Sequence, residues 1–234
     1  MIPPVIALHG NVGSFHDWDF LRRAEIQAID LWEHSHRRFA DFSVMLRKST
    51  PNGSLLLGYS MGGRLALHAM AARPEHWAGA VIISVHPGLC CLQERIERRV
   101  SDEIWARRVR EMRWSDFLEK WNSQSVLGAS SGGESQLRLE SKRERIARSF
   151  ENWTLGKQED LRPALAKFRK PVLWITGQRD KQFTRLGKEM ENVFPTFQQV
   201  IVPACGHRVL KEKPEALAME LNQFLCQVSS GTME

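Results

Sequence analysis

Short apolar runs alternate along this chain with longer stretches in which apolar residues recur every three or four positions. The short runs predict buried strands, and the longer periodic stretches predict amphipathic helices. Such alternation is typical of an α/β protein with right-handed crossovers and a mostly parallel sheet flanked by helices. The predicted strands are residues 4–8, 27–31, 54–59, 81–85, 171–177 and 198–202.

The pattern changes between residues 87 and 161, where Arg- and Glu-rich helical periodicity replaces the strands. We therefore expect a single domain, with a core formed by residues 1–86 and 162–234 and a helical cap inserted at 87–161. A Gly- and Ser-rich run at 128–133 interrupts the cap, and this composition is typical of a flexible loop or hinge. A helical insertion that follows a strand would cover the mouth of a site at that edge of the sheet.

The strand at 54–59 ends in the most informative motif of the chain. Ser60 stands between Gly58 and Gly62, where the apolar strand passes into a helix predicted at 62–73. This arrangement is a nucleophile elbow, in which a strained turn lifts the serine hydroxyl clear of the sheet. The alternative, an inert serine in a Gly-rich connection, is disfavoured by the partners that follow along the chain.

An activated serine needs an imidazole to take its proton and a carboxylate to orient the imidazole. Asp180 follows the predicted strand at 171–177, and His207 follows the strand at 198–202, so the order Ser, Asp, His is complete. Both residues lie beyond the carboxyl ends of strands, where sites form in open α/β sheets. The alternatives are a surface-loop histidine and an aspartate that only caps a strand end or forms a salt bridge.

An oxyanion hole requires two backbone donors beside the serine. The amide of Met61 supplies one of them, because this residue directly follows the nucleophile. We expect the second donor from Asn11, in the loop after the first strand. His9 precedes Gly10 in that loop, and we expect it to be a structural histidine that points beneath the loop.

Composition limits the classes of function. With 234 residues, of which 42% are hydrophobic, the chain can bury one α/β core. A formal net charge of +6 suits anionic substrates. The basic residues are interspersed with Glu and form no stripe with aromatic residues, so no nucleic-acid partner is predicted.

The four cysteines have neither a C-x-x-C motif nor metal-ligand spacing, which favours a reducing compartment. No cofactor and no metal is predicted. The N-terminus has no signal-like region and no apolar run reaches about 18 residues, so we expect a cytoplasmic protein without membrane insertion. The sequence leaves the oligomeric state open.

These features together resemble the α/β-hydrolase superfamily over nearly the whole chain. A narrower resemblance, to the menaquinone-pathway 2-succinyl-6-hydroxy-2,4-cyclohexadiene-1-carboxylate synthases, extends over several motifs in register. It implies an α/β-hydrolase fold with a helical cap. The chain departs from the superfamily in beginning at the strand that leads to His9 and Gly10, so we expect the one or two usual N-terminal edge strands to be absent. The motifs are Gly-Tyr-Ser-Met-Gly-Gly-Arg at 58–64, Val-His-Pro-Gly-Leu at 85–89, the helix around 94–106, Trp-Asn-Ser-Gln-Ser-Val at 121–126 and Gly-Gln-Arg-Asp at 177–180.

The resemblance implies a lyase that eliminates pyruvate from 2-succinyl-5-enolpyruvyl-6-hydroxy-3-cyclohexene-1-carboxylate, with Ser60 as a base. A small anionic substrate with several carboxylates favours guanidinium groups at fixed positions. Arg64 lies about one helical turn beyond Ser60 and can face the same pocket. By the resemblance, further carboxylate clamps are Arg98 and Arg138, and the pocket is shaped by Tyr59 and Trp121. On composition alone, the charge run around Arg98 is also typical of a solvated helix face.

Two segments depart from the synthase pattern. Asp-Leu-Trp-Glu-His-Ser at 30–35 replaces Asp-Leu-Pro-Gly-His-Gly, and Lys181 and Gln182 displace a lysine expected after Asp180. Two other functions therefore remain open. The first is a serine carboxylesterase or thioesterase that uses Ser60 as a covalent nucleophile. The second is a catalytically silent binding protein on the same scaffold.

Overall fold

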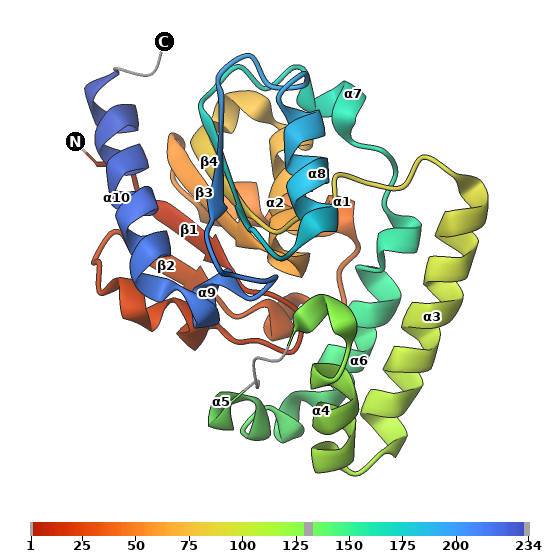
Figure 1. Ribbon diagram of the computed structural model, residues 1–234. Helices are drawn as coiled ribbons and strands as arrows, with labels where there is room; N and C mark the ends of the chain where they lie inside the picture. Colours follow the sequence, from red (N-terminus) through yellow and green to blue (C-terminus); the bar gives the residue numbers. More distant parts are fainter. Residues whose placement is uncertain (1, 129–132, 232–234) are drawn as a thin grey trace.

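The computed structural model describes residues 2–128 and 133–231 (Figure 1). Its centre is a six-stranded sheet in the order β2-β1-β3-β4-β5-β6, and every adjacent pair of strands is parallel. The mostly parallel α/β fold predicted from the alternating pattern is therefore confirmed. The strands are β1 (Val5–Leu8), β2 (Ile26–Ile29), β3 (Ser54–Tyr59), β4 (Trp77–Ile83), β5 (Val172–Gly177) and β6 (Phe197–Val202).

All six predicted strands are present, but two of them end earlier than predicted. β2 stops at Ile29 because Asp30 caps the following 3-10 turn η2 (Leu31–His34), and its carboxylate accepts a hydrogen bond from the Trp32 amide. β4 stops at Ile83 because Ser84 adopts a φ of 50°, which lies outside the strand region. The altered segment at 30–35 thus forms a capped turn beside the sheet.

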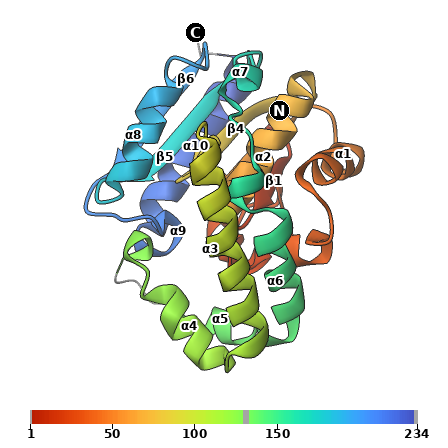
Figure 2. The ribbon, with the colours of Figure 1, turned by 90° about the vertical axis from the view of Figure 1, so that its right-hand side faces the viewer.

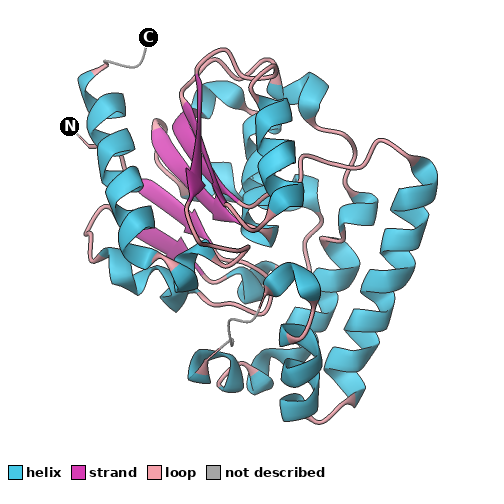
Figure 3. Ribbon diagram, in the orientation of Figure 1, coloured by secondary structure: helices cyan, strands magenta, loops and turns pink. Residues whose placement is uncertain are grey.

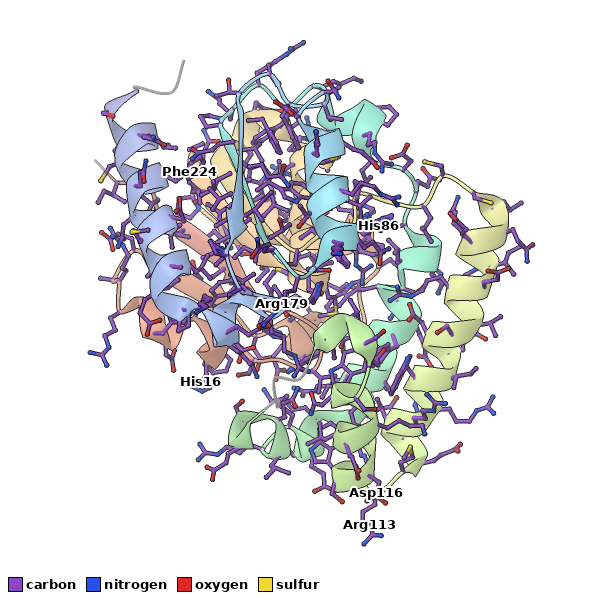
Figure 4. All side chains as sticks on the ribbon, in the orientation of Figure 1. His16, His86, Arg113, Asp116, Arg179 and Phe224 are labelled. Carbon is purple, nitrogen blue, oxygen red and sulfur yellow. The ribbon has the colours of Figure 1, made fainter. Side chains whose placement is uncertain are left out.

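Successive strand residues alternate between two apolar layers, one on each face of the sheet. Ile6 and Leu8 belong to the layer covered by α1, α2, α7 and α8, whereas Val5 and Ala7 belong to the layer covered by α10 (Figures 1 and 2). Phe224 points from α10 toward the sheet and is almost completely buried (Figure 4). The helices of the core are α1 (Phe39–Ser49), α2 (Met61–Ala72), α7 (Arg162–Leu165), α8 (Lys181–Met190), α9 (Val209–Glu212) and α10 (Pro214–Ser230), with the 3-10 turns η1 (Phe15–Leu21) and η3 (Pro74–His76).

The segment between β4 and β5 consists of helices and connecting loops, and its described residues contain no strand (Figure 3). Its two ends meet where the Leu161 amide donates to the Pro87 carbonyl at 3.0 Å, so these helices form an insertion that leaves and rejoins the core at one place. The hinge predicted at 128–133 lies mostly outside the described residues. The elements of this cap are α3 (Leu92–Glu111), α4 (Trp114–Asn122), η4 (Ser125–Leu127), α5 (Glu134–Leu137), η5 (Glu140–Lys142), α6 (Arg143–Asn152) and η6 (Leu155–Lys157).

Aromatic side chains hold the cap helices together on the side facing the core. Trp105 of α3 meets Trp121 of α4 edge to face at 5.1 Å, and Trp121 meets Phe150 of α6 at 5.5 Å. Such contacts are worth about 0.5–1.5 kcal/mol each beyond their buried area. In the described residues, no helix is long and apolar enough to cross a membrane.

His68 of α2 gives the folded state a predictable sensitivity to acid. Its ring stacks on Phe39 at 4.0 Å, and burial together with the Arg64 charge lowers its pKa to about 3. Below about pH 6.5 the imidazole is protonated in the unfolded chain but stays neutral in the folded chain. The free energy of unfolding therefore falls as the pH falls. We expect His68→Leu to weaken this loss by about 2–3 kcal/mol between pH 7 and pH 4.5, measured by denaturant unfolding at both values. An equal loss in both proteins would contradict the assignment.

Candidate active site

The nucleophile elbow predicted from the glycine pattern is present at the junction of β3 and α2. Ser60 has φ 50° and ψ −112°, a conformation that side-chain-bearing residues rarely adopt. The close approach of strand and helix depends on glycine, because a Cβ built on Gly58 would lie 2.6 Å from the Cα of Gly63. A Cβ on Gly62 would lie 2.3 Å from the Leu8 carbonyl oxygen. Larger residues at these positions would push the helix away from the sheet.

Ser60, His207 and Asp180 form one hydrogen-bonded relay. The distance from the Ser60 Oγ to the His207 Nε2 is 3.2 Å, and the distance from the His207 Nδ1 to the Asp180 Oδ2 is 2.7 Å. An ionised carboxylate can only accept, so the Nδ1–H donates to Asp180 and leaves the Nε2 lone pair facing the serine hydroxyl. This is the geometry in which an imidazole can remove the serine proton.

Two loops bring Asp180 and His207 together, although the residues are 27 positions apart. The loops follow the neighbouring strands β5 and β6, and they are joined where the Arg179 amide donates to the Cys205 carbonyl at 2.8 Å. The loop backbones pass so close that a Cβ on Gly177 would lie 2.1 Å from the Gly206 oxygen. Neighbouring parallel strands therefore place the two side chains at one edge of the sheet, as the sequence order predicts.

The loop after β1 lies directly beside the nucleophile. A Cβ on Gly10 would lie 3.7 Å from the Ser60 Cβ, and Asn11 lines the same cavity as Ser60. Met61 is the first residue of α2, so its amide lies at a helix N-terminus, where N–H groups have no intrahelical acceptor. The assignment of both amides to an oxyanion hole stays a prediction. His9 is fully buried, and its Nε2 accepts a hydrogen bond from the Leu31 amide at 3.1 Å, as expected of a structural residue.

A cavity of about 310 Å³ opens over the relay between the core and the cap. Tyr59 and Phe183 flank the His207 ring on its walls, with centroid distances of 5.8 and 4.6 Å. Trp121 lines the cavity from the cap side, next to Trp105. Tyr59 and Trp121 therefore both lie on the wall of the cavity, where the sequence predicted them. Gln182 also lines the cavity, whereas Lys181 is exposed and does not contribute to its walls.

Arg64 and Arg98 both line the cavity, one from the elbow helix and the other from the cap. Arg64 is buried and its Nη1 donates to the Trp153 carbonyl at 2.6 Å, at the end of α6. Burial and the nearby Arg98 charge lower the pKa of Arg64 to about 9, so it remains cationic at neutral pH. The Arg98 Nε is 2.9 Å from both carboxylate oxygens of buried Asp102. Asp102 thus orients the Arg98 side chain at the cavity wall. The same side chain is about half exposed, as expected for a charged helix face.

Arg138 is not part of the site, which corrects the expectation from the sequence. It follows the four-residue helix α5, and its side chain is exposed outside the cavity. Gln136 lies there instead and is 3% exposed. The physical reason is that side chains two positions apart on a helical turn point to different sides. Residue 136 therefore faces the cavity and residue 138 faces the solvent.

The structure adds cavity residues that sequence reasoning left without a role. Arg208 directly follows His207, and Lys211 lies one turn further, in α9. The position next to the predicted base was a usable signal for Arg208, whereas nothing in the sequence singled out Gln136. His86 belongs to a motif recognised in the sequence, and burial, with the nearby Arg64 charge, lowers its pKa to about 4. Its Nδ1 accepts the Gly88 amide at 3.0 Å, so neutral His86 carries its proton on Nε2.

The lining is cationic overall. Within the described part of the chain it includes four cationic side chains, Arg64, Arg98, Arg208 and Lys211, against the two carboxylates Asp17 and Asp102. The same part of the chain contains no group of three or more His, Cys, Asp or Glu residues that could hold a metal ion.

Comparisons with known proteins agree with this geometry. A family model described as "Alpha/beta hydrolase family" matches residues 5–220. The 2-succinyl-6-hydroxy-2,4-cyclohexadiene-1-carboxylate synthase of Salmonella typhimurium is 30% identical over 241 residues, which cover 95% of this chain and 94% of that protein. The enzyme of the same name from Salmonella arizonae is 30% identical over 242 residues, which cover 96% and 94%.

Solved structures share the fold at lower sequence identity. MenH from S. aureus superposes with a TM-score of 0.86 at 20% identity, covering 98% of this chain and 95% of that chain. Carboxylesterase CesB from Bacillus subtilis superposes with a TM-score of 0.69 at 18% identity, covering 96% and 84%. Because a protein named a carboxylesterase shares this fold, the fold alone does not show which reaction the chain catalyses.

Proposed function

This chain belongs to the alpha/beta hydrolase family, and we propose that it acts in menaquinone biosynthesis as a 2-succinyl-6-hydroxy-2,4-cyclohexadiene-1-carboxylate synthase. The proposed reaction eliminates pyruvate from 2-succinyl-5-enolpyruvyl-6-hydroxy-3-cyclohexene-1-carboxylate. The observation that carries the proposal is the combination of a serine relay with several cationic side chains in one cavity. A neutral ester has no need of those cations, whereas a substrate with three carboxylates does.

The chemistry of the relay suits proton removal from the substrate ring. Carbon 2 of the ring lies next to the succinyl ketone, so its hydrogen is acidic. The Ser60 proton passes to the His207 Nε2, and the serine oxygen then takes the proton from carbon 2. The freed electron pair forms the 2,3 double bond, the 3,4 double bond moves to position 4,5, and the bond from carbon 5 to the ether oxygen breaks. The enolpyruvate that leaves takes up a proton and becomes pyruvate.

The developing negative charge needs donors at a fixed place. Removal of the proton at carbon 2 puts charge on the succinyl ketone oxygen, and the amides of Met61 and Asn11 are the proposed donors for it. Each such donor is worth about 10²- to 10³-fold in rate in comparable sites. Asp180 keeps the imidazole in the orientation and tautomer that receive the serine proton.

Pyruvate release tests this proposal directly. We expect the purified protein to release one pyruvate for each enolpyruvyl substrate consumed, as measured by coupled lactate dehydrogenase. The diene product absorbs in the ultraviolet and gives a second, independent readout. A neutral chromogenic ester, assayed in parallel, measures the competing hydrolase activity.

The outcomes separate the three candidate functions. Pyruvate release with slow ester turnover supports the synthase. Fast ester turnover without pyruvate release would make the protein an esterase or thioesterase, with a covalent acyl group on Ser60 that mass spectrometry detects. No turnover of either substrate would favour a silent binding protein, although the complete relay speaks against it.

A further inference from the structure

Val12 has a strained backbone conformation directly beside the predicted oxyanion hole. It follows Asn11, it is fully buried, and its φ of 52° lies in the left-handed region. A β-branched residue rarely adopts that region, because its Cβ comes too close to the following carbonyl oxygen. Such strain persists only where the surrounding structure enforces it. The loop after β1 therefore needs contacts that keep Val12 in this conformation.

The core supplies contacts on either side of Val12. The Asn11 Oδ1 accepts the Val12 amide at 3.0 Å. The Gly13 amide donates to the Gly10 carbonyl at 3.3 Å, and the Trp32 Nε1 donates to the Gly13 carbonyl at 2.9 Å. These bonds fix the two ends of the turn, but none of them involves the Val12 carbonyl.

The Val12 carbonyl is held from the cap. The Gln136 Nε2 donates to it at 2.9 Å, although the two residues are 124 positions apart. Gln136 is 3% exposed, and it lines the same cavity as Val12. A carbonyl oxygen can only accept, so the Gln136 side chain presents its NH2 group to Val12. This contact joins the cap to the residue that follows Asn11.

Two side chains of α4 keep Gln136 in place. The Asn122 Nδ2 donates to the Gln136 Oε1 at 2.9 Å, and the Trp114 Nε1 donates to the Gln136 backbone carbonyl at 3.0 Å. The helices α4 and α5, which carry these residues, lie side by side at one end of the cap (Figures 1 and 2). A buried amide that is hydrogen-bonded at both its oxygen and its nitrogen is held rigidly, so it can fix the group to which it donates.

We propose that Gln136 is a positioning residue that completes the oxyanion hole from the cap. Its amide keeps the Val12 backbone in the strained conformation, and this conformation keeps the Asn11 amide directed at the developing negative charge. The proposal rests on the proposed function in one respect, because Asn11 is a donor of that mechanism. Oxyanion donors are effective only when they are preorganised, and a displacement of about 1 Å can lower a rate about 100-fold.

The test uses diethyl 4-nitrophenyl phosphate, a small neutral reagent without carboxylates. The Ser60 Oγ attacks the phosphorus while its proton passes to the His207 Nε2, the bond from phosphorus to the aryl oxygen breaks, and 4-nitrophenolate leaves. The phosphoryl oxygen gains negative charge in this step and therefore requires the oxyanion hole. The second-order rate constant is measured from the absorbance of 4-nitrophenolate, and the mass of the diethylphosphoryl protein confirms the stoichiometry.

Gln136→Met keeps the length of the side chain and removes its hydrogen bonds. We expect it to lower the rate constant for phosphorylation of Ser60 about 10- to 100-fold. With the enolpyruvyl substrate, the kcat should fall by a similar factor while the KM changes by no more than about three-fold, because the donor acts on the transition state. Gln93→Met makes the same replacement at an exposed position of α3 and should leave both rates unchanged.

Val12→Gly provides a readout that a purely structural role of Gln136 would not affect. Glycine adopts positive φ about as readily as negative φ, so this loop no longer depends on the contact from the cap. In the Val12→Gly protein, we therefore expect Gln136→Met to lower the rate constant by no more than about three-fold. An equal loss in both backgrounds would overturn the proposal.

Gln136→Glu supplies a second test should Gln136→Met fail to fold. A carboxylate can still accept from Asn122, but it cannot donate to the Val12 carbonyl until it is protonated. Burial raises the pKa of a carboxyl group, so the rate constant relative to that of the wild type should rise as the pH is lowered from 8 to 6. A constant ratio over this range would contradict the proposed donor role.

The proposal is also overturned if the wild-type protein is not phosphorylated at Ser60, or if Gln136→Met reacts as fast as the wild type. If Gln136 only holds the cap in place, Gln136→Met would lower the melting temperature and raise the KM without slowing the reagent. Because the reagent is not the substrate, a wild-type protein that is phosphorylated but releases no pyruvate would refute the proposed function and leave this result intact.

Discussion

Replacing Ser60 by Ala is expected to lower pyruvate release about 10³- to 10⁶-fold, the range found when one member of such a relay is removed. The reason is geometric, because the serine oxygen is hydrogen-bonded to His207 and lines the cavity, where the proposed mechanism has it take the substrate proton. Alanine keeps the Cβ and therefore the shape of the elbow. We expect the KM to change by no more than about three-fold, since the hydroxyl contributes little to substrate binding. The measurement is a steady-state pyruvate assay with each protein.

His207→Gln provides the matched comparison for Ser60→Ala. If both residues act in one relay, the double variant should be about as slow as the slower single variant, because removal of one member already disables the unit. Losses that multiply would mean that the two residues act independently. Should Ser60→Ala retain more than about a tenth of wild-type turnover, the serine oxygen would not be the group that takes the proton.

Much of the fold was predictable because its signals are local. The apolar runs that become β1, β3 and β5 form interior strands of the sheet. Such strands are buried on both faces, so their sequences are almost continuously apolar and indicate a strand. The nucleophile elbow was predictable because glycine at positions 58 and 62 is a steric requirement of the turn itself. Asp180 and His207 were predictable because each lies in the loop after a strand of the same parallel sheet.

The cap contributions were less predictable, because they depend on contacts between distant segments. Arg138 lies just after a Gly- and Ser-rich run and a helix of only four residues, so no long periodic pattern fixes which side chains face the cavity. The Arg64 contact with the Trp153 carbonyl spans 89 positions, and helical spacing carries no information about it. Arg208 escaped notice because it has no motif of its own beyond its position after His207.

Replacement of Arg64 by Ala is the second change with a large expected effect, and it separates a synthase from an esterase. The guanidinium lines the cavity one helical turn beyond Ser60 and stays charged at neutral pH. A charge-assisted contact with a substrate carboxylate is worth about 1.5–3 kcal/mol. The kcat/KM for the enolpyruvyl substrate should therefore fall about 10- to 150-fold, while hydrolysis of a neutral ester, if detectable, falls by much less.

The structure also shows why Arg64→Ala needs a companion variant. The truncation leaves the Trp153 carbonyl without its guanidinium donor, and it opens space beside Phe39, whose ring lies 5.9 Å from the guanidinium carbon. Arg64→Lys keeps a cation in place but loses the planar fork, so an intermediate kcat/KM is expected if the fork binds a carboxylate. Arg73→Ala removes an exposed arginine just after the same helix and controls for net charge. If Arg64→Ala slows both substrates equally and lowers the melting temperature, the arginine holds the cap to the core and does not select the anion.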